Sequence, residues 1–178
     1  MNQKLDKFSQ TIITRLEETC PQALQRATHL LGELTLVVDR ASLLEVCTSL
    51  RDDPALAFNM CDLSAVDVWP QRPRFQVNVH LLSIPAGKRL RVKVCLEERM
   101  AYAPTLSGVW PCAAWYERET HELFGITFQR HPDPRPLLLP DDWDHAPPLR
   151  RDVSMPVEEV AFSFSQERIY RDKPFAQE

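Results

Sequence analysis

The sequence predicts an α+β fold, a two-layer domain in which helices pack on a mixed, largely antiparallel sheet. Two observations support this prediction. Apolar residues recur at helical spacing over 5–16, and the segments 75–81 and 90–96 alternate apolar and polar residues as half-buried strands do. In chain order the segments run helix, strand, helix, several strands and a helix, followed by an extended proline-rich strap, which is typical of the α+β class.

The first helix should end near Pro21, because the residue before a proline is disfavoured in the helical region. A second helical piece is expected over 22–31, ending at Gly32. Alternating residues at 34–38 then indicate the first strand.

Ser42 should begin the next helix. Glu45 follows three residues later, which is the spacing of a capping box, in which each side chain bonds the other residue's backbone N–H. The helix should close at the polar run 51–54, with Cys47 on its apolar face as a small core residue rather than a reactive thiol.

Residues 57–69 are interpreted as a strand with an irregularity near Asp62. Two prolines in 69–73 indicate a turn before the two alternating segments, which should pair as an antiparallel hairpin with one buried and one wet face. We expect a loop over 102–111, leading into the last helix.

That last helix is expected over 115–124, with Leu123 and Phe124 buried and Gly125 as the C-cap, because glycine enters the left-handed conformation without a steric penalty. The segment beyond it is dense in proline, which fixes φ and removes backbone donors, so it can neither join a sheet interior nor continue a helix. Its apolar side chains are too many for a solvated linker: Leu137, Leu138, Leu139, Trp143 and Leu149. This strap therefore needs a surface to lie on, either its own domain or another protein.

These boundaries divide the chain into an α+β core domain over 1–128, the strap of the same domain over 129–153, and a C-terminal tail over 154–178. One short strand is expected in the tail, at 160–164. The length of 178 residues is ordinary for a single domain.

The composition excludes several functional classes. A net charge of -4 gives no basic excess for binding nucleic acid. No apolar run approaches the roughly 18 residues of a membrane span, and the N-terminal residues lack a secretory cleavage site, so we expect a soluble chain without a signal peptide. The five cysteines show no CxxC spacing, which indicates a reducing cytosolic compartment and no iron–sulfur cluster.

No catalytic motif is complete. His121-Glu122 begins like the zinc motif HExxH, but Gly125 stands where the second imidazole is needed. Glu117 and Glu119 lie about 200° apart around a helix, so they cannot flank one scissile bond. We expect no catalytic, cofactor-binding or metal-binding residue in this chain. One alternative is a stand-alone metal-binding or hydrolytic domain built on His121, His131 and His145.

Charged side chains alternate with aromatic and apolar ones through the last helix and the strap. They can be surface ion pairs, each contributing less than about 1 kcal/mol. They can also be anchors of a desolvated contact with a partner protein. The residues alone leave both interpretations open.

An ordered series of motifs runs through the same region. It consists of Glu117-Arg118-Glu119, Glu122-Leu123-Phe124-Gly125-Ile126, His131-Pro132-Asp133 with Arg135, Leu138-Leu139-Pro140-Asp141-Asp142-Trp143 and Leu149-Arg150-Arg151-Asp152. Upstream, Leu90-Arg91-Val92-Lys93-Val94 and Gly108-Val109-Trp110-Pro111 belong to the series. Over roughly 34–152 the chain thus resembles the thirty-kilodalton subunit family of NADH-quinone oxidoreductase, which is respiratory complex I. Arg130 departs from that family, which usually has glycine before the histidine.

The resemblance implies a non-catalytic subunit in the peripheral arm of the proton-pumping NADH:quinone oxidoreductase. Such a subunit braces the quinone-binding module beside the large subunit, which is of the forty-nine-kilodalton type. NADH, FMN, iron–sulfur clusters and quinone would be bound by partner subunits and none by this chain. The resemblance also implies a peripheral position on the cytoplasmic side of the cell membrane. The alternative within this class is the equivalent subunit of a membrane-bound, energy-converting hydrogenase.

With the resemblance in hand, partner contact is favoured over plain surface ion pairs. The expected interface residues are Glu117, Arg118, Glu119, His131, Asp133, Arg135, Trp143, Arg150 and Arg151. The strap from Pro140 to Asp152 would lie against the large subunit, with Trp143 as an apolar anchor.

Overall fold

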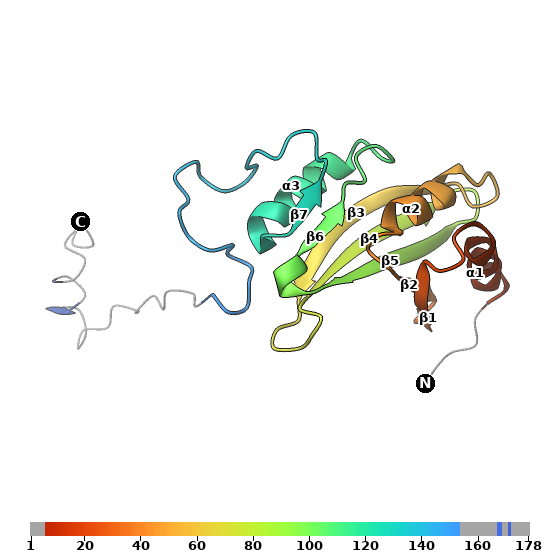
Figure 1. Ribbon diagram of the computed structural model, residues 1–178, viewed down its shortest axis with the longest axis horizontal. Coiled ribbons are helices and arrows are strands. Elements are labelled where there is room, and N and C mark those ends of the chain that lie inside the picture. The colour runs from red at the N-terminus through yellow and green to blue at the C-terminus, as the bar shows by residue number, and fades with distance from the viewer. Residues whose placement is uncertain (1–5, 154–166, 169–170, 172–178) are drawn as a thin grey trace.

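The computed structural model describes residues 6–153, 167–168 and 171 of the chain. Eleven elements follow one another along it (Figure 1). They are α1 (Lys7–Thr19), β1 (Leu24–Leu30), β2 (Glu33–Val38), α2 (Leu43–Asp52), β3 (Phe58–Asp67), β4 (Phe75–Ser83), β5 (Lys88–Leu96), the 3-10 helix η1 (Glu98–Met100), β6 (Tyr102–Pro104), α3 (Ala113–Phe124) and β7 (Thr127–Gln129). The expected short strand at 160–164 lies outside the described residues.

Five strands form one sheet in the order β1-β2-β5-β4-β3. β2 and β5 pair in parallel, and the other three pairs are antiparallel. A second, two-stranded sheet pairs β6 with β7 in parallel. The fold is therefore α+β with a mixed, largely antiparallel sheet, as the sequence predicts.

The core forms against one face of the five-stranded sheet. Alternate strand residues are buried there together with apolar residues of α1 and α2, because successive side chains of a strand point to opposite faces. The other face is polar, and its side chains pair across strands. Arg91 Nη2 lies 2.7 Å from Glu33 Oε2, and Lys93 Nζ donates to Gln76 Oε1 at 2.9 Å. The predicted hairpin of β4 and β5, with one buried and one wet face, is confirmed.

The predicted helix over 22–31 is wrong, because most of this segment is β1. Leu31 and Gly32 both have positive φ, 52° and 84°, and they make the two-residue turn that joins β1 to β2. Ala27 and His29 lie opposite Leu36 and Leu34 of β2. Gly32 thus closes a hairpin rather than capping a helix, and pairing with β2 overrides the weak local helical pattern.

The helices on either side are where the sequence places them. Asp6 caps α1 by accepting the backbone N–H of Ser9 at 2.8 Å. Helix α2 closes within the expected polar run and buries Cys47 completely, and this burial raises the pKa of the thiol. The capping box is wrong, because Ser42 has helical backbone angles and its side chain makes no capping bond.

Four further details concern the second half of the chain. The irregularity expected near Asp62 is confirmed, since the β3–β4 register shifts between Met60 and Asp62. The segment expected to be a loop over 102–111 begins with β6, whose partner β7 comes after α3. Leu123 and Phe124 are only half-buried. The α3 C-cap at Gly125 is confirmed, with φ 75°.

Candidate partner-binding surface

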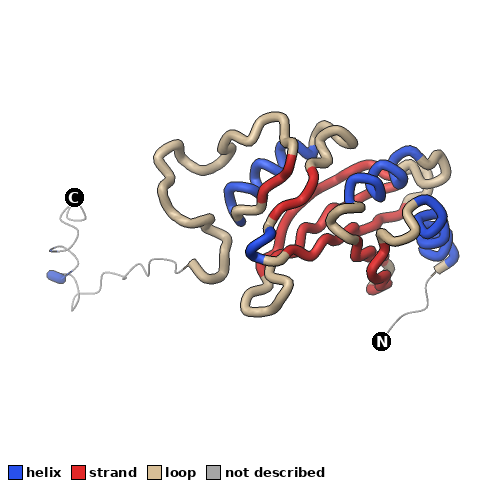
Figure 2. Tube along the Cα trace, in the orientation of Figure 1, coloured by secondary structure: helices blue, strands red, loops and turns tan. Residues whose placement is uncertain are grey.

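The strap leaves β7, passes beside α3, swings away from the domain and returns (Figures 1 and 2). It begins at Arg130, whose φ of 63° is left-handed. A side chain in that region costs about 1–2 kcal/mol, which glycine avoids. Arg130 thus adopts the conformation for which glycine is favoured, the residue usual at this position in the family the sequence resembles.

His131 ties the first part of the strap to α3. Its Nδ1 lies 3.0 Å from the backbone nitrogen of Asp133, and its Nε2 lies 3.0 Å from the carbonyl oxygen of Ala114. The N–H of Asp133 can only donate, so Nδ1 accepts and Nε2 carries the proton. Both nitrogens of this neutral imidazole are therefore used inside the chain.

Arg118 of α3 holds the next residues. Its Nε and Nη2 donate to the carbonyl oxygens of Arg135 and Pro136 at 2.8 and 2.7 Å. Asp133 Oδ2 lies 3.8 Å from Nη1 of Arg118, and the guanidinium also lies over the ring of Trp115. Two of the five N–H donors of Arg118 thus bond the strap backbone.

Glu122, one turn further along α3, accepts backbone N–H groups of the strap. Its Oε2 lies 2.6 Å from the nitrogen of Leu137, and its Oε1 lies 2.6 and 3.2 Å from the nitrogens of Leu138 and Leu139. Three consecutive N–H groups converge on one carboxylate, an arrangement in which the charge strengthens each bond.

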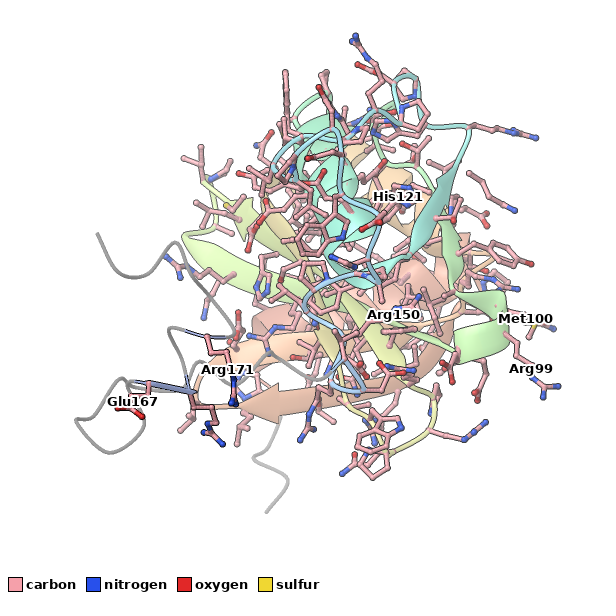
Figure 3. All side chains as sticks on the ribbon, turned by 90° about the vertical axis from the view of Figure 1, so that its left-hand side faces the viewer. Arg99, Met100, His121, Arg150, Glu167 and Arg171 are labelled. Carbon is pink, nitrogen blue, oxygen red and sulfur yellow. The ribbon has the colours of Figure 1, made fainter. Side chains whose placement is uncertain are left out.

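The returning part of the strap covers the end of α3. The N–H of Leu149 donates to the carbonyl of Leu123 at 3.0 Å, and Arg150 Nε donates to the carbonyl of Phe124 at 2.8 Å. Arg150, which Figure 3 labels, thereby joins the returning part of the strap to the end of α3. A Cβ added to Gly125 would meet Arg150 Nη2 at 2.5 Å and Pro147 Cγ at 3.1 Å, so glycine is needed for this close approach.

The strap ends on a buried ion pair of the sheet. Arg74 Nη2 lies 2.8 Å from Asp67 Oδ2, and the two side chains are 3% and 1% exposed. Asp152 of the strap binds the same guanidinium through two oxygens, at 2.5 and 3.0 Å, and Glu98 binds it at 2.5 Å. Asp67 also accepts the N–H of Arg151 at 2.9 Å.

These contacts determine the pKa of Asp67. Burial acts to raise it, but hydrogen bonds from Arg74 and from the N–H groups of Arg151 and Trp69 outweigh burial and lower the pKa to about 2. The pKa of Asp152 is lowered by its hydrogen bonds to Arg74. Both carboxylates are therefore charged at neutral pH, as a clamp on a guanidinium requires.

The expected interface residues divide into two groups. Glu117 is fully buried, so its assignment to a partner contact is corrected. Its carboxylate accepts the N–H of Leu106 at 2.6 Å and a hydroxyl bond from Thr105. Three more of the expected residues use their side chains for hydrogen bonds to the backbone of this chain: Arg118, His131 and Arg150. The exposed candidates are Glu119, Arg135, Trp143 and Arg151, and Arg135 is paired with Asp133 at 2.7 Å.

The sequence does not single out Trp115, Asp67 or Arg74 of this surface, whereas Leu138 and Leu149 are among the apolar strap residues expected to need a covering surface. Trp115 is 58% exposed on α3, and Leu138 and Leu149 are 60% and 51% exposed. The helical periodicity of the apolar residues in α3 is the signal that could indicate an outward-facing Trp115. Asp67 and Arg74 lie far from the strap in sequence, and no local pattern identifies them.

The described residues contain no group of three His, Cys, Asp or Glu side chains arranged to hold a metal ion. His121, His131 and His145, the basis of the metal-binding alternative, make separate contacts. His121 bonds the carbonyl of Ile126 at 2.9 Å, and His145 lies near Asp144 in the strap. None of the helices described has the length and apolar character to cross a membrane.

The fold and this surface define a class of protein: an α+β domain with a strap tied to its last helix and with exposed aromatic side chains along it. Residues 36–159 match the family described as "Respiratory-chain NADH dehydrogenase, 30 Kd subunit". The chain belongs to that family.

Relatives and solved structures agree. The chain is 42% identical over 169 residues to an NADH-quinone oxidoreductase subunit of Roseiflexus sp. (strain RS-1), covering 94% of this chain and 97% of the relative. A trypsin-resistant fragment of Nqo5 is 30% identical with a TM-score of 0.55, covering 68% of this chain and 98% of the fragment. A chain of the membrane-bound sulfane sulfur reductase, an archaeal respiratory membrane complex, has a TM-score of 0.70. That match covers 94% and 92% of the two chains at 21% identity and shows the fold alone.

Proposed function

We propose that this chain is a non-catalytic subunit in the peripheral arm of an NADH:quinone oxidoreductase. Its family and its relatives at 42% identity over most of the chain support this role. In the complex it braces the quinone-binding module while electrons pass from NADH to quinone through neighbouring subunits. NADH, FMN, iron–sulfur clusters and quinone are bound by those neighbours. The complex presents this subunit on the cytoplasmic side of the membrane, attached through its partners.

The partner that the strap meets is the large subunit of the quinone module. This assignment depends on how the segment 140–148, called here the docking loop, contacts the rest of the chain. In the described part of the chain, residues 140–146 make no hydrogen bond or ion pair to the helices or sheets; their contacts are local, such as Trp143 N–H to Pro140 O at 3.0 Å. Trp143 is 39% exposed, and an exposed tryptophan among the charged and proline residues of a loop is typical of an interface anchor.

The charge of the docking loop indicates the kind of surface it fits. Asp141, Asp142 and Asp144 lie within four residues, and no lysine or arginine interrupts them. The ring of His145 meets that of Trp143 edge-on, with centroids 5.4 Å apart. A basic surface with an apolar hollow on the large subunit complements this loop.

The hydrogenase alternative is not proposed. A likeness in fold to a chain of another respiratory membrane complex accompanies only 21% identity, whereas the Roseiflexus relatives, named as NADH-quinone oxidoreductase subunits, share 42% identity over nearly the whole chain. The sequence relatives therefore favour the NADH-quinone oxidoreductase.

Affinity purification from membranes tests the proposal. A tagged wild-type chain should co-purify with the large subunit and with NADH:quinone activity, and the chain alone should oxidise no NADH. Trp143→Ala should lower the amount of co-purified complex about tenfold or more, as loss of an interface hot spot does. The matched control is Trp69→Ala, because Trp69 is 45% exposed but lies outside the strap. Equal recovery with both variants would contradict the assigned contact.

A further inference from the structure

We infer that two carboxylate-centred clamps within this chain fix the two ends of the docking loop and so set its shape before the partner arrives. The first clamp is Glu122, and the second is the group of Asp67, Arg74 and Asp152. These are positioning residues. The inference rests on the proposed function for the identity of the partner but not for the clamps themselves.

The first clamp holds backbone rather than side chains. Arg118 and Glu122 lie four residues apart on α3 and therefore on the same face. Arg118 donates to the carbonyls of 135 and 136, and Glu122 accepts from the N–H groups of 137–139. A positive and a negative side chain on one helix face thus form hydrogen bonds with the backbone of five consecutive strap residues, 135–139. The apolar side chain of Leu138 stays 60% exposed as a result.

The second clamp fixes the strap through both charge and backbone. Asp152 takes two bonds from the Arg74 guanidinium, and the N–H of Arg151 bonds Asp67, which is itself paired with Arg74. Because Arg74 and Asp67 are buried, they cannot swing away to follow the strap. The strap end therefore takes its position from the sheet.

Between the clamps lie the nine residues of the docking loop, 140–148, and then residues 149 and 150, which bond the end of α3. Pro140 stands at one end and Pro147 and Pro148 at the other, so the junctions are stiff as well as anchored. Pro147 lies close to Gly125 at the end of α3. A loop with both ends fixed gives up less conformational freedom on binding, which is how preorganisation raises affinity.

The chain offers a matched control for each clamp. Glu119 lies on α3 beside Glu122 and is exposed, with no hydrogen bond to the strap within the described residues. Glu98 binds the same guanidinium as Asp152, and the two side chains are 43% and 40% exposed, but Glu98 belongs to η1 and not to the strap. Glu119→Gln and Glu98→Gln therefore remove a comparable charge without touching the docking loop.

Hydrogen exchange on the purified full-length chain tests the clamps. Glu122→Gln should speed exchange at the amides of 137–139 about tenfold, the effect of losing one charge-assisted bond. Asp152→Asn should do the same at 149–151, whereas Asp152→Glu, which keeps the carboxylate, should not. The two control variants should stay within about twofold of wild type, and sheet amides should be unchanged throughout. Unchanged exchange in Glu122→Gln and Asp152→Asn would overturn the clamps.

Glu122→Gln, Asp152→Asn and the control Glu98→Gln are then scored for recovery of the assembled complex, whereas Glu119→Gln serves only the exchange measurement because Glu119 is itself an expected interface residue. Reduced recovery with Glu122→Gln and Asp152→Asn, and normal recovery with Glu98→Gln, supports the positioning role. Faster exchange with normal recovery would overturn that role and leave the family assignment intact. Failure of the wild-type chain to join a complex would instead overturn the proposed function, while the exchange result would still decide the clamps.

Discussion

The carboxylate of Glu117 lies 3.8 Å from Nε2 of His131, yet the two groups do not share a hydrogen bond. The imidazole N–H is directed to the carbonyl of Ala114, and the carboxylate is served by the hydroxyl of Thr105 and the N–H of Leu106. A buried acid is thus held by neutral donors, and it joins α3 to the segment before it. Burial raises the pKa of Glu117 above its ordinary value.

This raised pKa gives Glu117 an unusual effect on stability. The folded chain binds the proton of Glu117 more tightly than the unfolded chain, so stability falls as the pH rises from the ordinary value of 4.5 through the raised one. Glu117→Gln should therefore gain in melting temperature relative to wild type between pH 4 and pH 8. Thermal melts across that range measure the difference, with the exposed Glu119→Gln as control. Parallel profiles for wild type and Glu117→Gln would contradict the prediction.

Asp67 should have the opposite pH dependence. Its pKa is about 2 in the folded chain against an ordinary 3.8, so its stabilising effect is present above pH 4 and is lost as the pH falls toward 2. Wild type should exceed Asp67→Asn by about 2 kcal/mol in free energy of unfolding at pH 7. Urea titrations at pH 7, 4 and 3 should show this gap closing. A gap that stays constant would mean that Asp67 acts through packing and not through its charge.

Gly125→Ala should loosen the returning part of the strap. The left-handed backbone costs an alanine about 1–2 kcal/mol, and its Cβ would also displace Arg150 and Pro147. Gly87→Ala is the control, because Gly87 has φ 59° with nothing within 4 Å of an added Cβ. Both variants should lose stability, but only Gly125→Ala should expose 147–150 to faster hydrogen exchange. Equal exchange at 147–150 in the two variants would show that Gly125 is not needed to hold the returning part of the strap.

Arg118→Ala should free the carbonyls of Arg135 and Pro136 and leave Asp133 with Arg135 as its partner. We expect a loss of about 1 kcal/mol in stability, since the guanidinium bonds are partly exposed. Hydrogen exchange should also become faster at the amides of 137–139, because Glu122, which accepts their N–H groups, lies on the same helix face as Arg118. Arg99→Ala, on the exposed η1 (Figure 3), should change neither quantity. A variant as stable as wild type with an unchanged strap would show that Arg118 matters only to a partner.

The parts of the fold that the sequence predicts are those with a local cause. The period of the apolar residues places α1, and strict alternation places β4 and β5, because burial of one face sets both patterns. Segment 22–31 has no such pattern, and its conformation follows from pairing with β2. A conformation fixed by a distant neighbour leaves little trace in the segment itself.

The same reason limits prediction of the surface. Proline density identifies the strap, and its aromatic and charged residues lead to the prediction of a contact region. The sequence does not disclose that Glu122 would face inward to the strap while Glu119 faces solvent, because that depends on how α3 sits on the sheet. It also gives no sign that Arg74 meets Asp152, since the turn and strands between them decide it.

The bond from Arg151 to Asp67 joins residues 84 positions apart, and that from Arg74 to Asp152 spans 78. During synthesis the sheet can be completed while 149–152 are not yet made, since folding proceeds from the N-terminal side. The strap is fastened last, and only onto a finished sheet. A copy whose sheet is misfolded therefore cannot hold 149–152 in place, so the position of the docking loop depends on a correctly folded sheet.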